Sequence, residues 1–237
     1  MLFFRGQELT LQQHASFAGQ FSELVPHPFV QSVEGFPGLI EIVKERDART
    51  NWGGISLHPD LTFFDEPPIG AVLYAREVPL HGGDTLFVNM YLAYETLSEG
   101  MKNLLAGLRG VHVSTEPTSY SANFKGMREK QNQAGTAIHP MVVTHPHTGR
   151  KALYTNAYTK RLENMTVEES QPILDFLARH AARPEFSCRF HWTAGTVVMW
   201  DNRVTMHYAI EDNLGTESGH GYRRVMHRAT FAGERPQ

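Results

Sequence analysis

Cysteine, long apolar runs and charge of one sign are all scarce in this chain of 237 residues. Cys188 is the only cysteine, which excludes an internal disulfide and any cysteine-rich zinc or iron–sulfur site, and fits a reducing cytosol. A bound metal would have to be held by histidine and carboxylate. No stretch approaches the roughly 18 apolar residues that a membrane helix needs, and the opening MLFFRGQ has no long apolar run of the signal-peptide kind. We therefore expect a soluble cytoplasmic protein with no membrane partner.

The charge balance narrows the class of partner further. The formal net charge is -3, the sequence pI is near 6.5, and no run of Lys and Arg is present. These features give no electrostatic reason to expect a polyanion, so we predict no nucleic-acid partner. A hydrophobic content of 41% argues against disorder. The length is enough for one sizeable core, and we predict a single domain over residues 1–237.

Periodicity and turn residues predict a mainly β chain with flanking helices. Short strands are expected at 2–4, 39–43, 71–76, 85–88, 141–144, 152–156, 185–192, 196–200 and 222–231. Helices are expected at 10–24, at 92–108, and from the capping box of Thr166 and Glu169 through Leu177. Residues 26–50 are interpreted as mostly irregular, and 115–135 as a long surface loop or lid. Many short strands and few helices favour a barrel or sandwich over βαβ units.

A small set of histidines and carboxylates could bind a metal. The chain has thirteen histidines, too many for all to be functional, so the question is which of them cluster. His58 and Asp60 form an H-x-D pair in LHPDLTF, and on an extended strand both side chains point the same way. His207 follows the apolar segment TVVMW, where a later strand could face the first. Two histidines and one carboxylate leave positions open, which suits non-haem Fe(II) that binds a co-substrate and O₂.

Two arginines near the C-terminus could serve such a site. Fe(II) with two neutral imidazoles and one carboxylate is still positive, which favours an anionic chelating co-substrate such as a 2-oxo acid. The far carboxylate of that acid would need a planar, two-pronged cation, which arginine offers. Arg224 and Arg228 lie on one face of the last predicted strand, about 13 Å apart at the usual rise. The alternative interpretation is a pair of solvent-exposed strand residues.

Four segments together resemble a known family. They are LFFRGQELTLQQ, LHPDLTFFDEPPIGAVLYAREVPLHGGDTLFVN, HPMVVTHPHTGRKALYTN, and WDNRVTMHYA followed by YRRVMHRATFAG. They resemble, in order and over nearly the whole chain, the taurine dioxygenase and 2,4-dichlorophenoxyacetate dioxygenase (TauD/TfdA) family of Fe(II)/2-oxoglutarate-dependent oxygenases. The resemblance implies a double-stranded β-helix, or jelly roll. It also implies that the family's first strand or two are absent before Met1.

The resemblance assigns roles to the candidate residues. It implies that His58, Asp60 and His207 hold Fe(II), and that Thr85 in GGDTLF and Arg224 anchor 2-oxoglutarate. These are the expected catalytic, metal and co-substrate residues.

Substrate recognition is implied with departures from the family. Arg228 matches an arginine near the metal that contacts substrate or co-substrate anions, and His27 in PHPF matches a histidine that helps to bind sulfonate in the taurine enzymes. At three other positions this chain departs from the family. It has Val30 in place of a tyrosine, Leu57 in place of a tryptophan, and Gly54 in place of an asparagine. The side of a taurine pocket that recognises the amine is therefore not matched.

The implied reaction is oxidative decarboxylation of 2-oxoglutarate by O₂ to succinate and CO₂, coupled to hydroxylation of a small anionic substrate. Alkylsulfonates such as taurine, alkyl sulfates and aryloxyalkanoates are the expected substrate types, and the family tendency predicts a homo-oligomer. Two alternatives stay open. A metal-dependent jelly-roll lyase or isomerase would keep the three ligands without needing Thr85 and Arg224. A non-catalytic small-molecule-binding barrel would bind no Fe(II).

Overall fold

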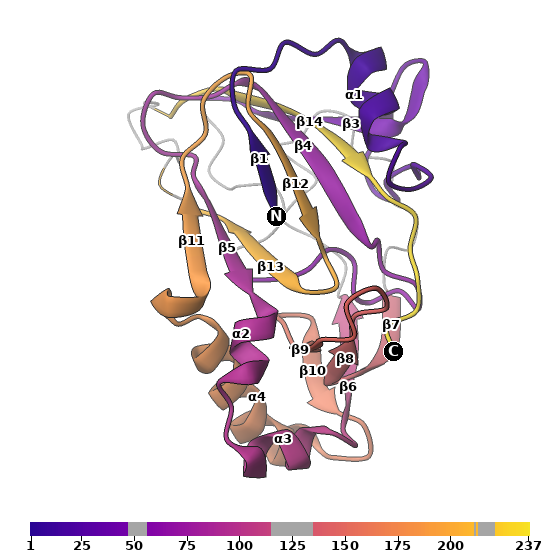
Figure 1. Ribbon diagram of the computed structural model, residues 1–237, viewed down its shortest axis with the longest axis vertical. Coiled ribbons are helices and arrows are strands. Elements are labelled where there is room, and N and C mark those ends of the chain that lie inside the picture. Colours follow the sequence, from indigo (N-terminus) through magenta and orange to yellow (C-terminus); the bar gives the residue numbers. More distant parts are fainter. Residues whose placement is uncertain (47–55, 115–134, 211, 213–220) are drawn as a thin grey trace.

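The computed structural model describes residues 1–46, 56–114, 135–210, 212 and 221–237, and they form a mainly β structure with four α-helices in the described part (Figure 1). The elements follow in the order β1 (Leu2–Phe4), α1 (Leu11–Ala18), β2 (Ser32–Val33), β3 (Phe36–Lys44), β4 (Gly70–Glu77), β5 (Thr85–Asn89), α2 (Met90–Glu95), α3 (Glu99–Leu105), β6 (Arg109–Ser114), β7 (Gly135–Pro140), β8 (Val142–Thr144), β9 (Lys151–Leu153), β10 (Thr159–Leu162), α4 (Val167–Ala181), β11 (Ser187–Phe190), β12 (Val197–Asp201), β13 (Thr205–Ala209) and β14 (Arg224–Thr230).

Two antiparallel sheets form the jelly roll that carries the candidate site. The major sheet has the strand order β1-β12-β4-β14-β3-β2, and the minor sheet has the order β11-β5-β13. An isolated bridge between His58 and His207 adds the H-x-D segment to the free edge of β13. The metal-binding candidates thus lie on neighbouring segments of the minor sheet, although they are far apart in sequence.

Side chains from both sheets share one core. The buried residues that fill it come from β4, β5, β12 and β14 and from the segment of β11, and they are Ala71, Ala75, Phe87, Phe190, Trp192, Val198, Trp200 and Met226. Alternate residues of the major sheet point the other way and pack under α1, among them Val72, Tyr74, Val197 and Ala229. This period-two alternation is what a strand with both faces covered requires.

The other end of the molecule consists of helices and two small sheets (Figure 1). Strands β10, β6 and β7 form a three-stranded sheet, here called the small sheet, and β8 pairs with β9. Helices α2, α3 and α4 pack on these strands through a second core that includes Leu105, Leu153, Leu162 and Leu177, each fully buried. Met206, beside His207 on β13, belongs to the same core and joins this end to the minor sheet.

Several expected elements have different bounds in the structure. The capping box of Thr10 and Gln13 starts α1 as predicted, but the helix ends at Ala18, before Gly19, which has low helix propensity. The single helix expected at 92–108 is wrong: it is two helices, because Ser98 caps a new one with its side chain. The strand expected from residue 185 begins with a 3₁₀ turn, Pro184–Phe186.

Five strands lie outside the ranges that the sequence analysis predicted. They are β2, β6, β7, β10 and β13. In addition, β3 extends beyond the expected 39–43 within a segment interpreted as mostly irregular. Strands β6 and β7 carry the buried polar residues His112 and His139 at positions where a periodicity search looks for apolar ones. The expected lid lies outside the described residues, apart from Gly135, which begins β7.

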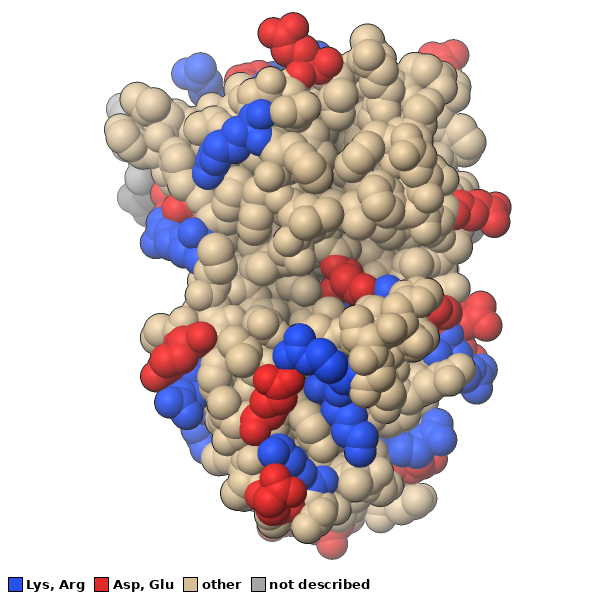
Figure 2. All heavy atoms as spheres, viewed as in Figure 1, with Lys and Arg blue, Asp and Glu red and all other residues tan. Residues whose placement is uncertain are grey.

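Charged side chains are distributed unevenly over the face shown in Figure 2. On the face shown in Figure 2, acidic and basic side chains are intermixed over the lower half, and the upper half is mostly neutral. No single-sign patch therefore stands out on the described part of that face.

Among the helices of the described residues, none is long and apolar enough to cross a membrane.

Candidate metal and co-substrate site

The structure brings His58, Asp60 and His207 together. One ligand atom of each lies within 4.8 Å of the others. Backbone hydrogen bonds in both directions hold the two histidines side by side, from His58 N to His207 O (3.1 Å) and from His207 N to His58 O (2.9 Å). Asp60 is not on an extended strand, as the sequence analysis expected. It begins a turn, and the turn directs its carboxylate toward the two rings.

The protonation of these groups suits a cation. Burial lowers the pKa of both imidazoles, that of His207 to about 3, and outweighs the opposing charge of Asp60. Burial alone would raise the pKa of Asp60, but the charge and hydrogen bond of Arg228, with a contribution from the two nearby imidazoles, reverse the effect and lower it. At neutral pH the site therefore has two neutral nitrogen ligands and one ionised carboxylate.

The donor set fits a divalent metal ion. The Nδ1 atom of His58 lies 2.7 Å from Ser56 O, so Nδ1 carries the proton and the lone pair of Nε2 is left for a metal. The Nε2 atom of His207 and Oδ1 of Asp60 are 3.7 Å apart, too far for a hydrogen bond. Two imidazoles and one carboxylate on one side of an ion are the ligands of non-haem Fe(II) sites with open positions.

Asn202 connects the two chain segments that bear the ligands. Its side chain is buried, its Oδ1 accepts a hydrogen bond from Trp200 Nε1 (2.9 Å), and the same oxygen lies 3.5 Å from Asp60 N. Its Nδ2 donates to Pro68 O (3.2 Å). The amide thus fixes the turn between β12 and β13 against the segment of Asp60.

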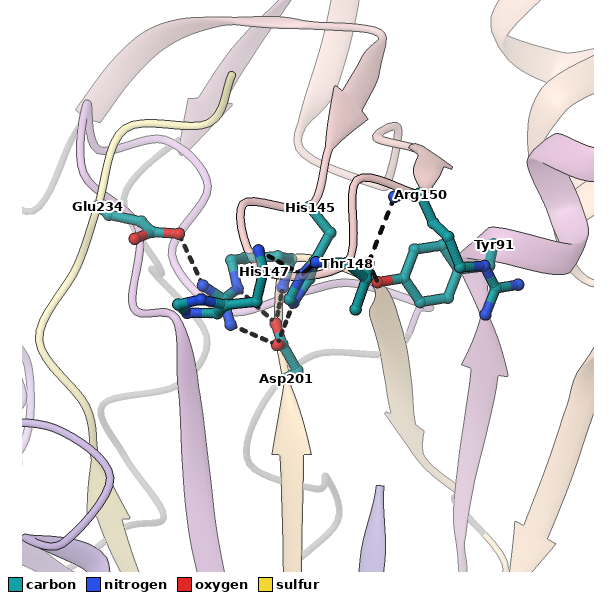
Figure 3. A network of polar contacts seen from close by, with 8 residues as sticks. Tyr91, His145, His147, Thr148, Arg150, Asp201 and Glu234 are labelled. Carbon is teal, nitrogen blue, oxygen red and sulfur yellow. Dashed lines mark hydrogen bonds and ion pairs between the residues drawn. The ribbon is translucent and has the colours of Figure 1, made fainter.

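A polar network anchors the same turn from outside (Figure 3). Arg203 donates to both carboxylate oxygens of Asp201, at 2.8 and 2.6 Å, and pairs with Glu234 at 2.8 Å. His145, which follows β8, lies with Nε2 3.0 Å from Asp201 Oδ2. The β8–β9 hairpin and the C-terminal tail are therefore tied to the turn that leads into β13 and His207.

Thr85 and Arg224 both lie next to Trp192. Thr85 begins β5 and accepts a hydrogen bond from Trp192 Nε1 at 2.9 Å. Arg224 begins β14, and its guanidinium lies over the Trp192 ring, 5.6 Å from the ring centroid. The two residues that sequence reasoning chose for one co-substrate are therefore brought to the same part of the jelly roll.

The Arg224 guanidinium is poised to bind an anion. Its Nε atom is buried and has no hydrogen-bond partner, and in the described part of the chain no carboxylate forms an ion pair with it. Burial lowers the pKa of Arg224 to about 10, with partial opposition from the charges of Asp212 and Asp84. The group stays charged at neutral pH, and a buried cation in this state is costly until an anion reaches it.

Arg228 lies beside the candidate metal ligands. Its Nη2 is 2.7 Å from Asp60 Oδ2, and its guanidinium lies 5.5 Å from the centroid of the Trp200 ring. Arg224 and Arg228 share a face of β14 with buried Met226, as the alternation predicted. The interpretation of these arginines as two solvent-exposed residues is wrong, because Arg228 is buried and the Nε atoms of both arginines are inaccessible.

His27 is buried near a cluster of aromatic rings. Its Nδ1 accepts from Phe29 N (3.2 Å), and Phe29 stacks on Phe63 with ring centroids 6.1 Å apart. Phe63 contacts Tyr158, whose ring lies 5.9 Å from that of His58. A continuous row of rings therefore leads from His27 to the metal-binding candidates, but no distance places His27 in contact with them.

Sequence reasoning missed Trp192 and Asn202 as parts of the site. Each acts through a neighbour that was chosen, Trp192 on Thr85 and Asn202 on Asp60. The signal for Asn202 was its place in WDNR, directly before the segment of His207. Trp192 gave no local signal, because its role depends on how β11 pairs with β5.

Comparison with known proteins identifies the family of the chain. Residues 1–230 match the taurine catabolism dioxygenase TauD, TfdA family. Over 99% of this chain and 73% of the relative, the chain is 34% identical to an alkylsulfatase from Acinetobacter baylyi. It is also 34% identical to an alpha-ketoglutarate-dependent sulfate ester dioxygenase from Pseudomonas putida, over 100% of this chain and 78% of the relative.

Two solved structures are similar throughout the chain. A taurine dioxygenase from Burkholderia xenovorans matches with a TM-score of 0.82 and 37% identity, over 99% of this chain and 76% of that one. AAD-2 in complex with Mn(II) and N-oxalylglycine matches with a TM-score of 0.77 and 29% identity, over 99% and 83%. These matches confirm the expected double-stranded β-helix fold. The chain belongs to the TauD/TfdA family and is a 2-oxoglutarate-dependent dioxygenase.

Proposed function

We propose that the chain uses Fe(II) and 2-oxoglutarate to hydroxylate a small anionic organic substrate. The observation that carries the proposal is the pairing of two features in one jelly roll: the triad of His58, Asp60 and His207, and the Arg224 guanidinium, whose buried Nε has no hydrogen-bond partner among the described residues. The first would hold Fe(II), which when bound would supply the activation of O₂. The second would fix the co-substrate.

The protein side chains would bind and orient 2-oxoglutarate. Its distal carboxylate would accept hydrogen bonds from the Arg224 guanidinium, which has the fork geometry for a carboxylate. Thr85 Oγ1 already accepts from Trp192, so its own hydroxyl proton is free to be donated to the same carboxylate. A sulfate ester dioxygenase and a structure with N-oxalylglycine among the similar proteins support this assignment.

The substrate is proposed to be a sulfate ester, an alkylsulfonate or an aryloxyalkanoate. Each would be consumed with one O₂ and one 2-oxoglutarate, and would leave as its hydroxylated form beside succinate and CO₂. When the new hydroxyl lies on the carbon that bears the heteroatom, the product collapses to a carbonyl compound and releases sulfate from an alkyl sulfate, sulfite from an alkylsulfonate, or the phenol from an aryloxyalkanoate. We assign recognition of the anion to Arg228 and His27, because Arg228 is a buried cation beside Asp60.

The two alternatives of the sequence analysis are disfavoured. A jelly-roll lyase or isomerase would have no use for the buried Arg224 charge beside Thr85. A binding barrel without catalysis does not fit the relatives, which are named as enzymes. We also propose, from the sequence, that the enzyme is cytoplasmic, has a single domain and forms a homo-oligomer. Light scattering after size-exclusion chromatography would test the oligomeric state.

Succinate release tests the function. The purified chain is supplied with Fe(II), 2-oxoglutarate and O₂, and a panel of alkyl sulfates, alkylsulfonates and aryloxyacetates is screened by proton NMR. At least one class should raise succinate formation above the rate without substrate, with equimolar release of sulfate, sulfite or the phenol. Asp60→Ala should abolish it, whereas Asp65→Ala, at an exposed position, should not. Folded protein that consumes no 2-oxoglutarate with any of these compounds would refute the proposal.

A further inference from the structure

Asp60 is followed by a residue in an unusual backbone conformation. Leu61 has φ = 52°, in the left-handed region that non-glycine residues rarely adopt, and its side chain is buried. A hydrogen bond from Phe64 N to Leu61 O (3.0 Å) closes the turn. Such a conformation persists only where the surroundings hold it in place. The direction of the Asp60 carboxylate therefore depends on whatever fixes this turn.

The contacts that fix it come from the small sheet and the loop before it. The side chain of Thr62, the next residue, is fully buried. Its Oγ1 lies 2.9 Å from His112 Nδ1 on β6 and accepts a hydrogen bond from Asn156 Nδ2 (3.2 Å). The Asn156 amide is oriented by Tyr158 N, which donates to its Oδ1 at 2.8 Å.

A second histidine holds the backbone of the same turn. His139 on β7 is buried, and its Nε2 lies 2.9 Å from Thr62 O and 3.0 Å from Phe64 O. Since both partners are carbonyl oxygens, Nε2 must carry the proton and donate to them. One imidazole thus ties together the carbonyls on both sides of Phe63.

The directions of these hydrogen bonds form one consistent set. Because Thr62 Oγ1 accepts from Asn156 Nδ2, its own proton is left to be donated, and His112 Nδ1 at 2.9 Å is a nearer acceptor than Asn156 Oδ1 at 3.4 Å. His112 Nε2 then carries a proton toward Thr159 Oγ1, 3.4 Å away. Burial lowers the pKa of His112 to about 3 and also lowers that of His139, so both rings are neutral and can make these bonds at neutral pH.

We propose that His112, His139 and Asn156 are positioning residues, which hold the strained Asp60–Leu61–Thr62 turn so that the carboxylate faces the metal. The small sheet would then serve as a rigid support for one metal ligand, outside the jelly roll that carries the other two. The inference rests on the proposed function only in that the triad binds a divalent ion. Removal of partners around a metal ligand costs about 10- to 100-fold in metal affinity in other sites.

Metal affinity without turnover is the direct test. Co(II) is titrated into the apoprotein, and its visible absorption reports both affinity and ligand geometry. Thr62→Val keeps the side-chain volume and removes only the hydroxyl, so it should weaken Co(II) binding by about 10- to 100-fold and alter the spectrum. Thr62→Ser, which keeps the hydroxyl, should bind as the wild type does. If Thr62→Val fails to fold, Asn156→Ala, at a less buried position, carries the same test.

A rescue separates positioning from general stability. Glycine adopts a positive φ without strain, so Leu61→Gly added to Thr62→Val should recover most of the lost affinity. Leu162→Ala provides the matched control, because it empties the core beneath the same sheet without contacting the turn. It should lower the unfolding temperature and leave Co(II) affinity unchanged.

The outcomes are distinguishable from failure of the proposed function. Wild-type Co(II) binding that is lost in His207→Ala establishes the metal site itself. If folded Thr62→Val then binds Co(II) with wild-type affinity and spectrum, the positioning role is overturned. It is also overturned if affinity falls equally in Leu162→Ala, because loss of stability alone would then account for the effect. Weakened binding in Thr62→Val with recovery in the double variant supports it.

Discussion

Arg224→Met should make the free protein more stable while it weakens binding of 2-oxoglutarate. The guanidinium lies in a buried place with an unpartnered Nε and no ion pair among the described residues. Methionine is apolar and of similar length, so it can fill the space over Trp192 without carrying a charge. Replacing an uncompensated buried ion by a well-packed apolar side chain is commonly stabilising.

The magnitude follows from the pKa of the group. Burial lowers the pKa of Arg224 to about 10, against the charges of Asp212 and Asp84. An exposed guanidinium titrates above about 12, and each pKa unit corresponds to about 1.4 kcal/mol, so holding the charge here costs about 3 kcal/mol. Losing the contact between the guanidinium and the Trp192 ring destabilises the variant by about 1 kcal/mol. We expect a net gain of about 1–2 kcal/mol, or about 2–8 °C in Tm for a chain of this size.

Calorimetry with and without co-substrate provides the assay. Without ligand, Arg224→Met should melt above the wild type. With Fe(II) and 2-oxoglutarate under anaerobic conditions, the wild type should gain about 2.7 kcal/mol at a ligand concentration of 100 times Kd, and the variant should gain little. The order of the two melting temperatures should therefore reverse.

Arg223→Met is the matched control for this reversal. Arg223 is the preceding residue and forms ion pairs with Glu45 and Glu77 on the surface. Its replacement should cost at most about 1 kcal/mol and leave the ligand-induced shift unchanged. A free Arg224→Met protein that is less stable than the wild type, yet still shifts fully with 2-oxoglutarate, would refute the reasoning.

Three further predictions concern other parts of the structure. Burial lowers the pKa of His14 to about 4, so the unfolded chain binds a proton that the folded chain does not. The free energy of unfolding should therefore fall by about 3 kcal/mol between pH 6.5 and 4 on account of this group. In urea unfolding, His14→Gln should lose less stability than the wild type over the same pH range. Trp192→Phe removes the donor to Thr85 and should raise the Kd for 2-oxoglutarate up to about tenfold by calorimetric titration. Leu177→Ala, in the second core, should cost about 2–5 kcal/mol in urea without changing Fe(II) affinity.

The sequence predicted the parts of the site that follow from local pattern. Alternation along β14 placed Arg224 and Arg228 on one face, and the structure has both with Met226 on the inner side. His58, Asp60 and His207 were chosen for their chemistry and do converge. Their roles, and those of Thr85, Arg224, Arg228 and His27 with the ligands, stay predictions.

What the sequence could not predict depends on contacts between distant segments. The expectation that Asp60 lies on a strand was wrong because Leu61 turns the backbone, and that turn is held by His112 and His139 from strands that were not predicted. Strands that bury polar side chains are not predicted from hydrophobic periodicity, because that signal depends on apolar residues facing the core. The bridge from Trp192 to Thr85 likewise follows from strand register.

The central claim is that one chain holds Fe(II) through His58, Asp60 and His207 and chelates 2-oxoglutarate on it. The most direct measurement is an anaerobic titration of the apoprotein with Fe(II) and 2-oxoglutarate, followed by visible absorption. We predict a weak metal-to-ligand charge-transfer band that is lost in His207→Ala and kept in His147→Ala, an exposed histidine. Properly folded protein that gives no band, or a band that survives His207→Ala, would contradict the account.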